Sequence, residues 1–95
     1  MSSDVSARLA AVGIQLLAEA KEYRLFGREN CAAFMHGDNA GSSGLMTEHG
    51  LAFLVWRGES PFLSAKGMEM PASAEQVETL RQFSEDLKRA LEPRP

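Results

Sequence analysis

Cysteine is almost absent from this chain: Cys31 is the only one among 95 residues. A single cysteine excludes a disulfide within the chain, so a domain of this size has to draw its stability from its core or from association with other chains. The N-terminal residues also lack the basic and apolar pattern of an export signal. Together with the lone thiol, this predicts a reducing, cytoplasmic setting.

Long hydrophobic runs and clusters of basic residues are missing as well. No apolar run approaches the roughly 20 residues that span a bilayer. The ten basic residues are scattered among 13 acidic ones, which gives a formal net charge of −3. Nucleic acids and anionic membrane surfaces both attract clustered lysine and arginine. We therefore expect no nucleic-acid partner and no membrane partner.

The usual catalytic and metal-binding motifs do not occur either. The sequence has no HExxH, no paired CxxC, no GxSxG and no phosphate-binding loop with its lysine. Cys31 lies in an apolar run, and on one strand it would point away from His36, so we expect a core cysteine rather than a nucleophile. We predict neither an enzyme nor a cofactor.

Both ends of the chain are predicted to be helical. Near the N-terminus, apolar residues recur at helical spacing from Val5 to Leu16, which predicts a helix from about Asp4 to Lys21 that tolerates Gly13 in its middle. Near the C-terminus, Ser73 and Gln76 have the spacing of a capping box. An apolar stripe follows this box, so we expect a second helix that begins at Ser73.

The middle of the chain favours strands instead. Residues 23–26 and 31–35 read as one hairpin, and "LMTEHGLAFLVW" reads as a second hairpin that turns at residues 48–50. Residues 61–65 predict one more short strand after a turn at residues 57–60. The segment "GDNAGSSG", residues 37–44, is rich in turn-favouring residues and is interpreted as a flexible connector. The prediction is a single α+β domain over residues 1–95, with two helices packed on an antiparallel sheet of four to five strands.

The segment "LAFLVW", residues 51–56, is apolar on both faces of a strand. Ala52, Leu54 and Trp56 would point to one side, and the three residues between them to the other. If both helices share one face, the other face has to be covered by a second copy or a partner. We therefore predict a protein-interaction domain, most simply a homodimer, that buries this face or pairs a free strand edge, with Ala52, Leu54 and Trp56 as interface candidates. A core or rim position of Trp56 within the monomer is the alternative.

The segment "HGDNAGSSGLMTEHG" holds both histidines of the chain. His36, Asp38, Glu48 and His49 would gather near one end of the sheet if the strands that carry them pair. These residue types suit a small-molecule or metal site, which is the alternative function. Their spacing matches no metal motif, so we predict no metal there.

Overall fold

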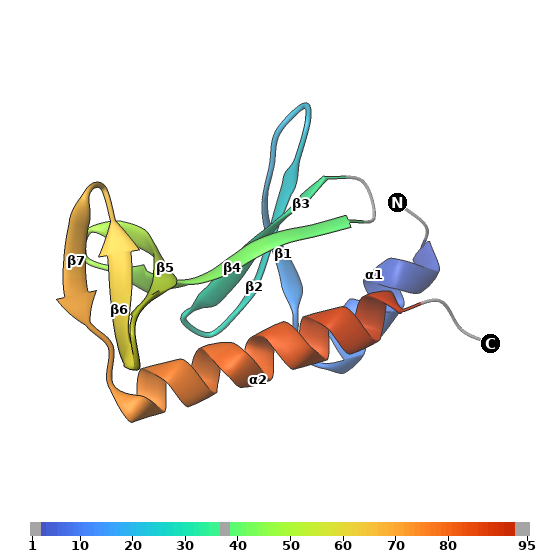
Figure 1. Cartoon of the computed structure of the whole chain (residues 1–95). Helices are drawn as coiled ribbons and strands as arrows, with labels where there is room; N and C mark the ends of the chain where they lie inside the picture. Colours follow the sequence, from blue (N-terminus) through green and yellow to red (C-terminus); the bar gives the residue numbers. More distant parts are fainter. Residues whose placement is uncertain (1–2, 37–38, 93–95) are drawn as a thin grey trace.

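The structure is a computed structural model that describes residues 3–36 and 39–92 (Figure 1). It has one helix at each end and a seven-stranded antiparallel sheet between them, so the α+β class is confirmed but four to five strands were too few. The elements are α1 (Ser3–Ala11), β1 (Gln15–Glu19), β2 (Arg24–Arg28), β3 (Cys31–His36), β4 (Asn39–Thr47), β5 (Gly50–Arg57), β6 (Ser60–Ala65), β7 (Met68–Pro71) and α2 (Ala74–Leu91).

The strands lie in the sheet in the order in which they follow in the chain, so every connection is a hairpin. Both helices lie on one side of the sheet, with α2 running beneath β3 and β4 (Figure 1). Phe83 and Leu87 of α2, Leu9 of α1 and Met35 of β3 are fully or almost fully buried in one hydrophobic core. The core therefore joins the helices to one face of the sheet.

The N-terminal helix is shorter than predicted, because Gly13 ends it. Gly13 has φ +79°, and its N–H donates to Ala10 O, while the N–H of Ile14 donates to Leu9 O. These two bonds form a Schellman motif, in which a glycine with positive φ closes a helix. The prediction that the helix continues to Lys21 was wrong, and residues 15–19 form β1 instead.

The prediction that residues 37–44 are a flexible connector was also wrong for the part that the structure describes. β4 begins at Asn39 and pairs with β3, with Gly44 opposite Ala32 and Ser43 opposite Ala33. A Cβ on Gly44 would lie 2.6 Å from Ala52 O of the neighbouring strand. This glycine therefore marks a close approach of two strands rather than a turn.

The remaining turns and the second helix agree with the prediction. Gly50 has φ +98° at the β4–β5 turn, and β5 and β6 are joined by the turn predicted at residues 57–60. Ser73 Oγ accepts from the Gln76 amide at 3.0 Å, and Gln76 Oε1 accepts from the Ser73 amide at 2.9 Å, so the capping box is confirmed. The strand that the prediction missed at this end is β7, which pairs with β6.

Candidate functional site

The strand β5 is apolar on both faces, and the structure shows which face the helices cover. Ala52 is completely buried in the core, and Leu54 packs against the same core. Trp56 continues this face but is 54% exposed. Ala52 is therefore a core residue with no surface to offer, whereas Leu54 and Trp56 border the surface on the helix side.

The opposite side of the sheet is a second apolar surface, which we call the open face. It is assigned from strand alternation and from the directly paired residues, which lie on the same face. Its larger side chains are Leu17 and Met46, which are exposed, and Leu25, Phe34, Leu51, Phe53, Val55 and Phe62, which are half-buried. Both described helices lie on the other side of the sheet (Figure 1), so neither of them covers the open face.

Small residues run across the middle of the open face. Gly27, Ala32 and Gly44 are direct cross-strand neighbours on β2, β3 and β4. A Cβ on Gly27 would lie 2.5 Å from Leu17 Cδ1, and a Cβ on Gly44 would lie 3.1 Å from Leu51 Cδ1. The two leucines thus lie over the small residues, and Ala32 is fully buried without a helix above it. The result is a broad apolar surface with small residues at its centre.

A groove of about 540 Å³ lies on the helix side, between the sheet and α2. Leu54 and Trp56 of β5 line it together with Val77 and Leu80 of α2, and Phe53, which lies where β4 and β5 separate, also contributes. Ser42 and Ser43 of β4 and Ser84 of α2 add hydroxyl groups to its wall. The lining is mostly apolar with a few polar groups, which is the usual composition of a binding site.

Arg81 of α2 also lines the groove, and its charge is already paired. Arg81 binds both Glu78 and Glu85 along α2. The hydrogen bonds from Arg81 lower the pKa of Glu78, and those carboxylates raise the pKa of Arg81. Two carboxylates against one guanidinium leave this rim negative.

The four residues of the alternative site do not come together among the described residues. His36 lies exposed at the end of β3, next to the start of β4, whereas Glu48 and His49 form the turn after β4. The nine-residue strand β4 separates these ends by about 26 Å. His49 Nε2 lies 3.5 Å from Glu48 Oε1. Asp38 lies outside the described residues. Within residues 3–36 and 39–92, no three His, Cys, Asp or Glu residues are placed to hold a metal ion.

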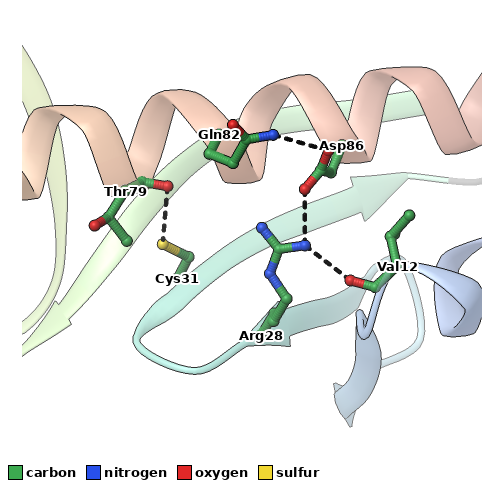
Figure 2. Close-up of polar contacts among 6 residues, drawn as sticks. All are labelled: Val12, Arg28, Cys31, Thr79, Gln82 and Asp86. Atoms are coloured by element: carbon green, nitrogen blue, oxygen red, sulfur yellow. Dashed lines mark hydrogen bonds and ion pairs between the residues drawn. The ribbon is translucent and has the colours of Figure 1, made fainter.

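Cys31 lies in the core, as expected, where β3 packs against α2 (Figure 2). Its Sγ donates to Thr79 O of α2 at 3.9 Å. Burial raises the pKa of the Cys31 thiol, and the positive charge of Arg28 opposes this only in part. A buried thiol with a raised pKa is a poor nucleophile.

No family model, curated protein or solved structure matches this chain. Of the helices in the described part of the chain, none has the length and apolar character needed to cross a bilayer. The open face and the groove are two candidate binding surfaces among the described residues. Two residues of the groove, Leu54 and Trp56, were predicted from the sequence as interface candidates. The open face was not, although its residues in β5 alternate with these two along the strand. The sequence signal for the open face was the hairpin that places the apolar residues Val55 and Phe62 opposite each other.

Proposed function

We propose that this chain is a non-enzymatic protein-interaction domain that forms a homodimer through the open face of its sheet. The observation that carries the proposal is the open face itself, which bears large apolar side chains from β1 to β6 and has neither described helix above it. Apolar patches of this extent on soluble proteins are typical of interaction sites. A two-fold axis would let the same surface pack against itself.

The exposed area of the chain supports this proposal. A compact monomer of 10.4 kDa is expected to expose about 5,400 Å². The chain exposes 6178 Å², which is an excess of roughly 800 Å². In a protein–protein interface of standard size, each partner buries about that area. The exposed area of the chain is therefore compatible with an interface of standard size.

The proposal places the domain in the cytoplasm. Its only cysteine is free and buried in the core, so no feature of the fold requires an oxidising compartment. Association with a second copy also supplies the stability that a domain of this size lacks.

Light scattering after size-exclusion chromatography tests the dimer. We expect twice the 10.4 kDa chain mass over a wide concentration range. Val55→Lys and Phe62→Lys place a charge on the open face, so they should give folded monomers. Met68→Lys is the matched control, because Met68 is exposed and pairs with the core residue Ala65 on the helix side. This control should remain dimeric. A monomeric unsubstituted chain at high concentration would refute the proposal.

The same measurement distinguishes the interface that the sequence predicted through Leu54 and Trp56. An interface on the helix side predicts that Trp56→Ala or Leu54→Asp gives a folded monomer, while Val55→Lys stays dimeric. The open-face interface predicts instead that Trp56→Ala stays dimeric, while Val55→Lys gives a folded monomer. Because Leu54 packs against the core, Leu54→Asp counts only if circular dichroism shows that it still folds.

A further inference from the structure

The sheet opens between β4 and β5 after only four residue pairs. Their pairing starts at the Thr47–Gly50 turn and ends with Gly44 opposite Phe53. Beyond this point β4 continues beside β3, and β5 continues beside β6. Residues 54–57 of β5 therefore have a neighbouring strand on one side only. The groove lies at this opening, since both β4 and β5 contribute to its lining.

Pro61 shows which backbone groups of β5 face the opening. Pro61 lies opposite Trp56, and Pro61 O accepts from the Ala72 amide, on the side of β6 away from β5. Trp56 and Pro61 therefore form a pair without mutual hydrogen bonds, and Trp56 directs its N–H and C=O away from β6. Leu54, two residues earlier, has the same orientation. The bonds to β6 are left to Val55 and Arg57.

Leu54 and Trp56 thus present both their side chains and their backbones to one site. Their side chains line the groove, and their N–H and C=O groups point into the gap between β4 and β5. An edge of this kind is a template for another strand. Proteins that recognise extended peptides combine such an edge with pockets for alternate side chains of the peptide.

The charge of the rim indicates the chemistry of the partner. Arg81 lines the groove and binds both Glu78 and Glu85, so this cluster at the rim carries one net negative charge. Positive residues in the partner would be attracted to this rim, and acidic ones would be repelled.

From these observations we infer that the opening between β4 and β5 binds an extended segment of a partner protein with alternating apolar residues and basic flanks. The segment adds as a strand along Leu54 and Trp56 and places an apolar side chain in the groove against Val77 and Leu80. This inference names a partner class for the proposed interaction domain. The docking site uses the helix side of the sheet, so it is separate from the dimer surface.

The probe is a synthetic peptide, acetyl-Lys-Val-Thr-Val-Thr-Val-Arg-amide, titrated into the full chain. Trp56 is the only tryptophan and is largely exposed, so its emission reports directly on the groove. We expect saturable binding with a blue shift of the emission. Two N-methylated versions, one blocked at the valines and one at the threonines, separate the two edges of the peptide. Only one version blocks the edge that faces β5, so it should bind at least tenfold more weakly than the other.

Two variants of α2 provide the matched control on the protein. Ser84→Arg fills the groove, whereas Gln82→Arg adds the same charge to an exposed position outside the groove lining. We expect at least a tenfold loss of peptide affinity in the first variant only. A peptide with glutamate in place of both basic residues should also bind at least tenfold more weakly.

Several results would overturn the inference. Equal binding of the two N-methylated peptides would refute strand addition, and equal loss in both α2 variants would refute the groove. Undiminished binding of the acidic peptide would refute the stated partner chemistry. If Trp56 emission shifts with protein concentration alone, a second copy occupies the site. Val55→Lys keeps the two proposals distinguishable. A monomeric variant that still binds the peptide supports both of them, whereas a monomeric variant refutes only this one if neither it nor the unsubstituted dimer binds the peptide.

Discussion

Arg28 of β2 and Asp86 of α2 form the ion pair that ties the sheet to the C-terminal helix. Arg28 Nη1 lies 2.9 Å from Asp86 Oδ2 and also donates to Val12 O at 2.8 Å (Figure 2). The guanidinium lies 5.7 Å from the centroid of the Phe83 ring. One side chain thus connects β2 with both α2 and the end of α1. Both partners are largely shielded from water, so the pair is more than a surface contact.

Asp86→Asn should destabilise the fold by about 1–2 kcal/mol, because it removes a charge-assisted hydrogen bond at a partly buried site. Urea unfolding at pH 7 and fixed protein concentration measures the loss. Glu85→Gln is the control, since Glu85 is an exposed neighbour on the same helix and pairs with the exposed Arg81. Little change is expected in this variant. Equal losses in the two variants would show that the Arg28–Asp86 pair contributes no more to the free energy of unfolding than an exposed ion pair.

The contribution of Asp86 should depend on pH in a defined direction. The hydrogen bond from Arg28 holds the pKa of the Asp86 carboxyl below its usual value. Since the pKa is lower in the folded state, ionised Asp86 stabilises the fold above about pH 4, and this contribution is lost as the pH falls through the folded pKa. The stability difference between the unsubstituted protein and Asp86→Asn should therefore shrink below about pH 4. A difference that stays constant down to pH 2 would contradict this assignment.

Gly13→Ala should destabilise the protein by about 1 kcal/mol, because alanine is strained at φ +79°. The sign is informative: within a continuous helix the same substitution would stabilise by up to about 1 kcal/mol. Gly58→Ala is the matched comparison, since Gly58 also has positive φ with open space around it, so backbone strain alone should give a loss of similar size. Urea unfolding compares the two variants. A stabilised Gly13→Ala variant would mean that the helix continues past Gly13 after all.

The N-terminal region shows why local sequence signals predicted only part of the fold. Residues 14–19 are rich in alanine and leucine, which favour a helix in isolation. In the structure Gln15 and Leu16 pair with Gly27 and Phe26, and this tertiary pairing outweighs the local preference. Gly13 ends the helix, but the sequence alone did not distinguish a terminating glycine from a destabilising glycine within a longer helix. The second helix was predicted correctly because its capping box is a local feature with its own hydrogen bonds.

The candidate surfaces, like the fold, were predicted only in part from the sequence. Strand alternation alone divides "LAFLVW" into two apolar sets, but which set the helices cover depends on the position of α2 across the sheet. Ala52 was assigned to the surface and lies in the core. The opening between β4 and β5 arises because β4 stays with β3 beyond Gly44, and this register is a long-range property that no short motif encodes.

Ser73→Ala should destabilise the protein by about 1 kcal/mol, because it leaves the Gln76 amide without its acceptor at the start of α2. Circular dichroism during urea unfolding measures the effect. Ser84→Ala is the matched control, since Ser84 lies on the same helix and no side-chain hydrogen bond of the described residues involves it. It should leave stability nearly unchanged. Similar losses in both variants would contradict a specific role of the cap.

Cys31 should react with a disulfide reagent at pH 8 at least about tenfold more slowly in the folded protein than in urea, because its thiol is buried beneath α2 with a raised pKa. Cys31 is the only thiol, so the reaction reports on this site alone. If the thiol is exposed only when α2 separates from the sheet, Asp86→Asn should accelerate the reaction of the folded protein by about 5- to 30-fold, the factor that corresponds to a loss of about 1–2 kcal/mol. An unchanged rate in this variant would mean that the reagent reaches Cys31 by a smaller local opening. Equal rates in the folded and unfolded protein would contradict the packing of β3 under α2.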